Sequence, residues 1–410
     1  MKLHMREGFT TGSAAAAAAC AAVTLLLSGR DSGPDTAGIA LPPFFLRDGR
    51  LTPQRGLRLD IPVACTRKDS ASGRAEAAVI KDGGDDPDVT HQIRIEVFAS
   101  RAACAFNGLQ RSCPVRLELD GNIYLEAGPG IGCVTLPGLP VLPGEPAINP
   151  EPRKQIAFAA REAALQYGYS GPLHLFLQAP QGRSMAESTL NSRLGIHGGI
   201  SILGTHGTVR PYSREAWQKT IARALDLANA LDFATIAFST GRRSEKALLA
   251  YFPGLPPQAV IQAADHARFS ILAARQRQFK NIIWACYPGK LLKLAQGLAY
   301  THADDAPADL RLLAGWAGRY GADARLCAQI SALPTAQGVF KSLLQTNPEV
   351  CAKLIRHVAG TALQTLSAWM ERSPLPARLT LCLFKSDHRL WLKLVRQHNP
   401  ARSVEACFNS

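Results

Sequence analysis

The sequence lacks the short motifs that identify many metal, nucleotide and hydrolase sites. Its ten cysteines include no Cys-x-x-Cys pair and no cysteine and histidine set at zinc spacing, so a structural zinc site is not indicated. They suggest no disulfide framework either, and we expect reduced thiols. The patterns GxGxxG, GxxxxGK, GxSxG and HExxH are absent, so the familiar dinucleotide, phosphate-loop, serine-hydrolase and metalloprotease sites are not predicted.

Long runs of like charge are also missing. The chain has 46 Lys and Arg against 32 Asp and Glu, a formal charge of +14, which attracts anions to the whole surface. The basic residues are dispersed, with no recognisable nucleic-acid motif beside them, so nucleic acid is not the expected partner. A polycarboxylate or a phosphorylated small molecule fits this charge as well.

No apolar stretch is long enough to cross a bilayer. Residues 14–27, AAAAAACAAVTLLL, superficially resemble the apolar region of a signal peptide. They are too short to span a membrane, and no small-residue cleavage site follows the leucines. Ala and Leu are strong helix formers. We therefore expect a buried helix in a cytoplasmic protein with no membrane association.

The 410 residues are enough for two domains with separate cores. Short β-type runs between residues 57 and 180, separated by turn residues, predict a mixed sheet. From about Trp217, apolar runs alternate with helical stretches, which predicts βαβ units and a parallel sheet. The predicted fold class is α/β: an α+β domain with a mixed sheet at residues 1–218, then a Rossmann-like three-layer α/β/α domain at residues 219–410.

Three loops follow apolar runs of the second domain, at residues 239–241, 264–266 and 287–290. Ligands of open parallel sheets bind beyond the carboxyl ends of the strands. The first and third loops place Gly at a helix start, where free N–H groups and the helix dipole favour an anion. Ordinary turns between strand and helix would have the same composition.

The loop KDGGDDPDVTH, residues 81–91, gathers four carboxylates and a histidine. It lacks EF-hand spacing, since Ile93 stands where the twelfth-position Glu would be. Three interpretations stay open: a hard-metal loop, a solvated turn between strands, or a loop that binds ligand hydroxyls or takes up a proton.

Two further stretches have an excess of small or hydroxylated residues. GFTTGS before the alanine-rich segment suits helix capping, but its two threonines and two glycines also suit a backbone nest for an anion. Residues 191–213 carry five glycines, which are tolerated where φ is positive or where a ligand or second backbone lies near. This stretch predicts either a ligand surface or two tight turns around a short strand.

Taken in order, five stretches closely resemble the CbiD family, the cobalt-precorrin-5B C1-methyltransferases of anaerobic cobalamin biosynthesis. The likeness extends from about Arg6 to His302 and fades beyond it into a helical pattern. The stretches are GFTTGSAAAAAA, KDGGDDPDVTH, PGLPVLPGEPAINPEPR, RLGIHGGISILGTHGTVRPYS and GKLLKLAQGLAYTH.

The resemblance implies methyl transfer from S-adenosylmethionine to ring carbon C1 of an anionic cobalt-tetrapyrrole, giving cobalt-precorrin-6A. The cobalt arrives inside the substrate, so no protein-bound metal is expected. Transient contact with neighbouring enzymes of the pathway is also implied. Positioning should dominate the rate, and arginine pairs well with the carboxylate arms of such a macrocycle.

With this chemistry in view, each candidate residue receives a role. The predicted catalytic residues, one of which removes a proton from the macrocycle, are Asp82, Asp85 and His91. The predicted cofactor-binding residues are Ser239, Thr240, Gly241, Gly289 and Lys290. The predicted substrate-binding residues are Thr10, Thr11, Ser13, Arg193, Gly198, Gly199, Thr205, Arg210 and Lys293.

The chain departs from the family at several motif positions. Ser13-Ala14 and Tyr287-Pro288 replace residues typical of the family, so those positions are not expected to be indispensable catalysts. His302 is expected to end the helix that Lys290 begins, with the two side chains at opposite ends. The alternative function is a non-catalytic binder of anionic tetrapyrroles or nucleotides, which binding of S-adenosylmethionine would distinguish.

Overall fold

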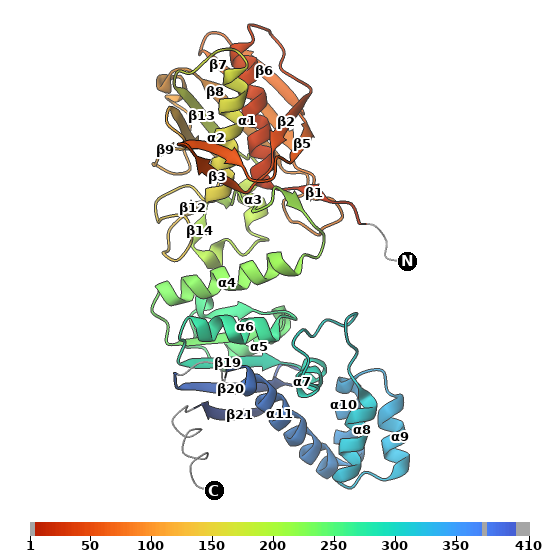
Figure 1. Cartoon of the computed structure of the whole chain (residues 1–410). Coiled ribbons are helices and arrows are strands. Elements are labelled where there is room, and N and C mark those ends of the chain that lie inside the picture. The colour runs from red at the N-terminus through yellow and green to blue at the C-terminus, as the bar shows by residue number, and fades with distance from the viewer. Residues whose placement is uncertain (1–4, 371–374, 399–410) are drawn as a thin grey trace. The chain divides into compact units, whose positions relative to one another are not determined.

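The computed structural model describes residues 5–370 and 375–398, and the chain divides into two compact units, Met1–Ser213 and Arg214–Ser410 (Figure 1). The boundary predicted after residue 218 lies inside helix α4 (Arg214–Ala230). As a border between independently folding domains, that boundary stays a prediction.

The first unit is built on a six-stranded mixed sheet with the order β6-β7-β8-β13-β10-β9. Its neighbours are antiparallel except β10 and β13, which run parallel. Helix α2 (Pro150–Leu165) lies between these two strands in the sequence. The predicted mixed sheet is confirmed. The strands are β6 (Cys65–Asp69), β7 (Arg74–Ile80), β8 (Arg94–Ser100), β9 (Leu117–Glu118), β10 (Ile123–Ala127) and β13 (Leu173–Gln178).

Residues 14–27 form most of helix α1 (Thr11–Leu27), as predicted. The helix packs against α2 and one face of the sheet, and most of its side chains are buried. A helix that is apolar on all sides must be enclosed by other elements. Its alanines allow the neighbouring backbones to approach closely, so α1 is the central element of this unit's core.

Five short strand pairs complete the first unit. Three of them join the glycine-rich residues 191–213 to distant parts of the chain: β1 (Gly8–Phe9) with β16 (Thr208–Val209), β11 (Gly130–Ile131) with β15 (Gly199–Ile200), and β12 (Cys133–Val134) with β14 (Ile196–His197). The other two are β2 (Thr36–Ala40) with β5 (Arg58–Pro62) and β3 (Phe44–Arg47) with β4 (Arg50–Pro53). The motif loops of this unit therefore converge near the first turn of α1.

Cys113 and Cys133 form a disulfide, which corrects the expectation that all cysteines are reduced. Their Cα atoms lie 5.7 Å apart, 20 residues apart in sequence. The sequence could not show this pair, because strand β12 brings Cys133 to the loop that carries Cys113. The other cysteines of the described residues are free thiols.

The second unit contains a five-stranded sheet with the order β18-β17-β19-β20-β21. The first four strands are parallel and β21 is antiparallel to β20. This confirms the predicted strands and shows that residues 377–384 return to the same sheet. The strands are β17 (Thr235–Ser239), β18 (Val260–Gln262), β19 (Asn281–Cys286), β20 (Ala377–Phe384) and β21 (Leu390–His398).

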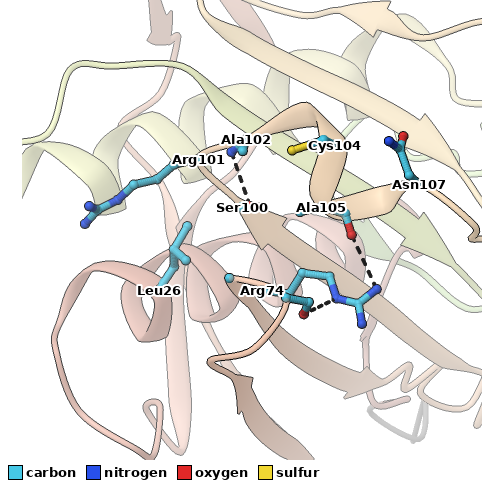
Figure 2. Close-up of a pocket in the computed structure, with 10 residues that line it drawn as sticks. Leu26, Arg74, Ser100, Arg101, Ala102, Cys104, Ala105 and Asn107 are labelled. Carbon is cyan, nitrogen blue, oxygen red and sulfur yellow. Dashed lines mark hydrogen bonds between the residues drawn. The ribbon is translucent and has the colours of Figure 1, made fainter.

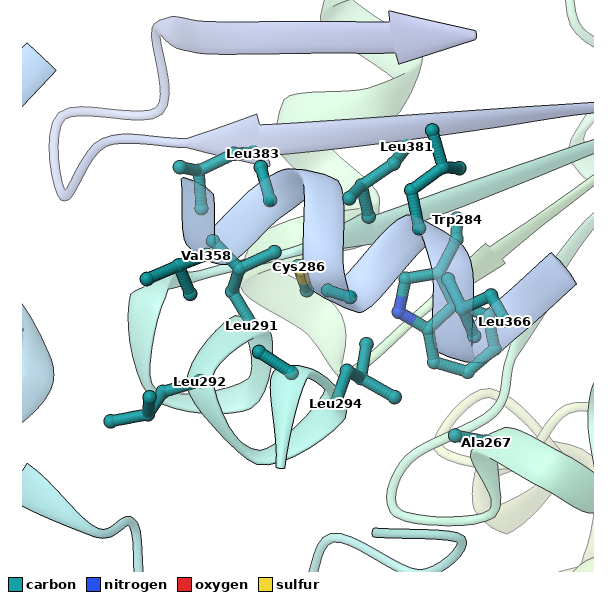
Figure 3. Close-up of a cluster of buried hydrophobic side chains, with 14 of the residues drawn as sticks. Ala267, Trp284, Cys286, Leu291, Leu292, Leu294, Val358, Leu366, Leu381 and Leu383 are labelled. Carbon is teal, nitrogen blue, oxygen red and sulfur yellow. The ribbon is translucent and has the colours of Figure 1, made fainter. Parts of the chain in front are cut away.

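Helices cover both faces of this sheet, as the three-layer prediction requires. One face carries α4, α6 (Ala267–Gln276), α7 (Pro288–Ala295) and α11 (Pro348–Met370) around a large apolar core. Figure 3 shows Leu291 and Leu294 of α7 in this core with Trp284 and Leu381 of the sheet. The other face carries α5 (Arg242–Tyr251). Helices α8 (Leu310–Arg319), α9 (Ala324–Ala332) and α10 (Ala336–Thr346) precede α11.

The strand order contains one reversal of direction. From β17 the chain passes through α5 to β18 on one side, then through α6 to β19 on the other side of β17. Because α5, which follows β17, and α7, which follows β19, lie on opposite faces, the loops after β17 and β19 diverge. Such a topological switch point opens a crevice at the carboxyl ends of the two strands.

None of the helices in the described ranges has both the length and the apolarity needed to cross a membrane.

Candidate functional site

The two loops predicted to bind a cofactor meet at this switch point. Ser239 ends β17 and is paired in register with Ala285 of β19, whose strand is followed by Tyr287 and Pro288. The glycines of the two loops, Gly241 and Gly289, both face open space where a Cβ would stand. The structure therefore brings the loops of residues 239–241 and 287–290 together, with open space beside the glycine of each loop.

Ser239 is completely buried, and its Oγ has no hydrogen-bond partner among the described residues. Gly241, the N-cap of α5, offers no side chain to the first N–H groups of that helix. Ser244 Oγ donates to the Gly241 carbonyl at 2.9 Å and lies 3.3 Å from Thr240 Oγ1. A buried polar group without a partner is uncommon and requires an explanation, such as a missing ligand.

Lys290 stands on the other side of the crevice in a compact polar network. Its Nζ contacts the carboxylate of Asp265, which follows β18, and donates to the Thr301 carbonyl at 3.0 Å. Thr301 Oγ1 donates to the same carboxylate at 2.9 Å. The expectation that Lys290 and His302 lie at opposite ends of one helix is wrong, because α7 ends at Ala295 and the chain turns back.

Lys293 is only 7% exposed. Its Nζ donates to the carbonyls of Thr301 and His302, both at 3.0 Å. Burial and the neighbouring Lys290 lower the pKa of Lys293. Lys293 therefore holds the returning chain in place, and its burial does not favour the predicted macrocycle contact.

Asp265 carries the negative charge of this network. Burial alone would raise the pKa of Asp265, but Lys290 and Thr301 outweigh that effect and the pKa lies below its usual value. The carboxylate is therefore ionised at neutral pH.

In the first unit, the hydroxyls of GFTTGS serve the chain itself. Thr10 Oγ1 caps α1 by accepting from the Ser13 N–H at 3.2 Å, and Ser13 Oγ donates to the Gly207 carbonyl at 2.8 Å. Thr11 Oγ1 accepts from the Leu203 N–H at 2.9 Å. All three side chains are buried, so the substrate-binding role predicted for them has no exposed hydroxyl to support it.

Most glycines of residues 191–213 face the chain's own atoms, which are backbone atoms at Gly199 and side-chain atoms at Gly195, Gly204 and Gly207. A Cβ at Gly199 would overlap the carbonyl of Gly130, within a second glycine-rich loop at residues 128–132, and one at Gly204 would overlap Thr10. Gly198 differs, because it is exposed, has a φ of +85° and faces open space. Only Gly198 among these remains available to a ligand on geometric grounds.

The acidic loop at residues 81–91 is held by its own contacts. The backbone N–H of Arg6 donates to Asp85 at 2.6 Å, and the Arg6 guanidinium pairs with Asp82. This Arg6 hydrogen bond and charge lower the pKa of Asp82. No group of three or more His, Cys, Asp or Glu in the described residues is arranged to hold a metal ion.

His91 makes contacts at both ring nitrogens, with its Nε2 lying 3.4 Å from Gln92 Nε2. Its Nδ1 accepts from the Gly83 N–H at 3.0 Å, so in the neutral ring the proton lies on Nε2. Nε2 can then donate but not accept. Of the three predicted catalytic residues, Asp85 is the exposed carboxylate; it accepts the Arg6 N–H, and its own N–H donates to the Arg6 carbonyl at 3.0 Å.

The remaining predicted macrocycle contacts, like the acidic loop, lie near the first turn of α1 in the first unit. Arg210 follows β16, its side chain is 76% exposed, and its Nε lies 3.1 Å from Glu7. Thr205 is exposed, and Arg193 is half-buried in the 3-10 turn Ser192–Leu194.

A surface hollow of about 650 Å³ lies elsewhere, near Leu26 at the opposite end of α1 (Figure 2). Figure 2 shows Arg74 directed to the carbonyl of Ala105, and its Nε donates to Ser72 Oγ at 2.7 Å. None of the predicted site residues lines this hollow, so the candidate site is separate from it.

Together, these features define an α/β protein whose second unit brings two glycine-containing loops together at the switch point of a largely parallel sheet. The comparisons then identify the family: the chain belongs to the CbiD family, whose pattern matches residues 1–211, while the CbiD C-terminal domain matches residues 300–393. The second match corrects the prediction that the likeness fades after His302.

Relatives with assigned names agree with this family. The chain is 46% identical over 327 residues to the cobalt-precorrin-5B C(1)-methyltransferase of Nitratidesulfovibrio vulgaris, covering 78% of this chain and 76% of that protein. It is 36% identical over 368 residues to that of Geobacillus sp. WCH70, covering 88% and 92%. The crystal structure of a cobalamin biosynthesis protein, CbiD from Archaeoglobus fulgidus, is 24% identical, covers 71% of this chain and 79% of its own, and aligns with a TM-score of 0.35.

Proposed function

We propose that this chain methylates ring carbon C1 of cobalt-precorrin-5B with S-adenosylmethionine, giving cobalt-precorrin-6A in anaerobic cobalamin biosynthesis. The observation that carries this proposal is the 46% identity, over most of both chains, to a protein named cobalt-precorrin-5B C(1)-methyltransferase. We further propose a cytoplasmic location, in keeping with the free thiols of the described residues, to which Cys113 and Cys133 are the exception.

The donor binds in the switch-point crevice of the second unit. Ser239, Thr240 and Gly241 supply polar groups and open backbone on one side, and Gly289 and Lys290 do so on the other. The unoccupied N–H groups of the first turn of α5 suit the carboxylate of the methionyl part. The partnerless Ser239 Oγ supports this placement.

The macrocycle binds at the end of the first unit where the first turn of α1 and residues 191–213 meet. Arg210 and Arg193 pair with its carboxylate arms, because charge-assisted bidentate hydrogen bonds favour arginine. Gly198 and Thr205 supply exposed surface without bulky side chains. We leave Thr10, Thr11, Ser13, Gly199 and Lys293 out of this contact set, since each is buried and packed within the chain.

The protein contributes mainly by positioning. The donor supplies an electrophilic methyl group and leaves as a neutral thioether that needs no protonation. Asp85 accepts the proton that the methylated ring loses, because its carboxylate is exposed and is held in place by the Arg6 N–H. The fixed loops that hold each reactant then set its orientation, which can supply a large part of the rate.

The activity is tested by incubating the protein with cobalt-precorrin-5B and methyl-labelled donor, then locating the label on the product. Label at C1 is expected. A protein that binds the macrocycle but neither binds nor consumes the donor would instead be a non-catalytic tetrapyrrole binder, and the proposal would fail.

The donor site is tested with Gly289→Ala. A Cβ at this position meets no atom of the chain, so the unfolding temperature should change little, while the affinity for S-adenosylmethionine should fall about tenfold or more if the donor lies against it. The matched control is Gly360→Ala in α11, which also faces open space. Equal donor affinity in both variants would exclude Gly289 from the site.

A further inference from the structure

The network around Asp265 joins three segments beside the proposed donor crevice. Asp265 follows β18, Lys290 lies in the first turn of α7, and Thr301 lies in the chain that returns after α7. Strands β18 and β19 flank β17. The contact between Asp265 and Lys290 therefore joins loops from the two sides of β17, where the crevice opens.

The charges of this network are unequal. The Nζ atoms of Lys290 and Lys293 both lie 3.0 Å from the Thr301 carbonyl. Asp265 is the carboxylate in contact with Lys290. The other charged groups nearby are paired elsewhere: Arg214 binds Asp305 and covers the Tyr300 ring at 4.1 Å. Loss of the Asp265 charge would remove the carboxylate that contacts Lys290 and would leave Asp304 and Asp305 as the carboxylates that still act on Lys293.

The backbone before Asp265 is held in an uncommon conformation. Ala264 has a φ of +47°, in the left-handed region that costs a residue with a Cβ about 1 kcal/mol or more. Strain of this kind persists where surrounding structure enforces it and often marks a functional position. Here it directs Asp265 towards Lys290 and Thr301, and the Thr301 N–H also binds the Asp265 carbonyl at 3.0 Å.

We propose that Asp265 is a positioning and charge-balancing residue that allows the lysine-bearing crevice to accept a sulfonium donor. This inference rests on the proposed donor site. S-adenosylmethionine carries a positive sulfonium, whereas its product S-adenosylhomocysteine carries a neutral thioether. Without the Asp265 charge, the positive Lys290 would repel S-adenosylmethionine but not S-adenosylhomocysteine. Asp265 therefore sets the ratio of the affinities for these two ligands.

The test compares the two ligands by isothermal titration of the whole protein. Asp265→Asn keeps the side-chain shape and removes the charge. We expect about a tenfold weaker affinity for S-adenosylmethionine, the scale of one unscreened charge at short range, with a much smaller change for S-adenosylhomocysteine. Asp265→Asn/Lys290→Met should return the ratio of the two affinities to the wild-type value.

The matched control is Asp226→Asn, which removes a carboxylate paired with Arg277 at 2.7 Å in the same unit. It should leave the affinity ratio unchanged. Two results would leave the ratio of the two affinities unchanged and would overturn the inference: Asp265→Asn weakens the binding of both ligands equally, or it weakens neither. The first would show a purely structural role for Asp265. A wild-type protein that binds neither ligand would instead overturn the proposed donor site.

Discussion

The ammonium group of Lys81 is almost fully buried and lies 2.7 Å from the carboxylate of Asp88. Both residues belong to the acidic loop of the first unit, and Thr90 donates two further hydrogen bonds to Asp88, at 2.7 and 2.6 Å. The loop is thus anchored by an ion pair whose cation cannot reach water. This pair makes the loop's position sensitive to the charge of Asp88.

We predict that Asp88→Asn destabilises the protein by about 3 kcal/mol, because it leaves a buried charge without its partner. Burial would raise the pKa of Asp88, but Lys81 and Thr90 hold it below its usual value. A lowered folded-state pKa stabilises the fold above the ordinary carboxyl pKa of about 4, and this stabilisation is lost as the pH falls further.

Chemical denaturation across pH 2 to 7 measures both effects. Wild type should lose stability below about pH 4, and Asp88→Asn should lose less over that interval. The control Lys81→Met/Asp88→Asn should recover part of the stability at pH 7. Identical pH profiles for wild type and Asp88→Asn would contradict the prediction.

Two adjacent glycines should respond differently to alanine. Gly199→Ala places a Cβ against the Gly130 backbone, which cannot move aside as a side chain could, and should cost about 3 kcal/mol of stability. Gly198→Ala meets no atom but requires a φ of +85°, and should cost about 1 to 2 kcal/mol. Thermal unfolding of both variants decides the order, and a larger loss for Gly198→Ala would show that packing against Gly130 is not limiting.

Arg210→Ala should weaken macrocycle binding by about 1.5 to 3 kcal/mol, the scale of hydrogen bonds to charged groups. Donor binding should stay nearly unchanged. Stability should change little, since Arg210 is largely exposed and its ion pair with Glu7 is of the weak surface kind. Titration with each ligand separately provides the measurement. The control Glu7→Gln should leave macrocycle affinity intact, and equal affinity in wild type and Arg210→Ala would remove this residue from the site.

Asp85→Asn should lower the turnover number by about a hundredfold or more, the usual contribution of a positioned base. Affinity for both ligands should persist, because the Arg6 N–H can still bind the amide oxygen. His91→Gln serves as the comparison and should cost less, since its Nδ1 is used by Gly83. Single-turnover kinetics separates chemistry from binding. A normal rate in Asp85→Asn would exclude it as the base.

Residues 1–213 expressed alone should fold and unfold cooperatively, because that unit contains a complete sheet and its own core. Circular dichroism during thermal unfolding provides the measurement. A non-cooperative transition would show that the first unit depends on the second, and would place the true domain border elsewhere.

The sequence predicted the long, regular elements and the loops that follow them. Strands β17 and β19 are continuous apolar runs, and α1 is rich in Ala and Leu, so local pattern was sufficient. The strand order was not predictable in this way, so the sequence placed residues 239–241 and 287–290 at one edge of the sheet but did not show that their strands are direct neighbours. Pairing order depends on contacts between segments that have no signature in either segment alone.

Short strands and glycines were harder to interpret. The pairing of β1 with β16 involves two residues on each side, too few to produce a periodic pattern. A glycine next to a ligand and a glycine next to another backbone have the same sequence signal, which is why Gly199 was predicted as a substrate contact. The shared face of Lys290 and Lys293 was detectable, since residues three apart lie side by side on a helix.

The hydrogen bonds that fix the first turn of α1 also have a consequence for synthesis. Thr11 binds Leu203, and Ser13 binds Gly207, at separations of 192 and 194 residues. At about 5 to 20 residues per second, a ribosome needs roughly 10 to 40 seconds to deliver those partners after α1 has emerged. During that time the first turn of this apolar helix lacks its hydrogen-bond partners, so α1 cannot complete its packing until residue 207 has left the exit tunnel.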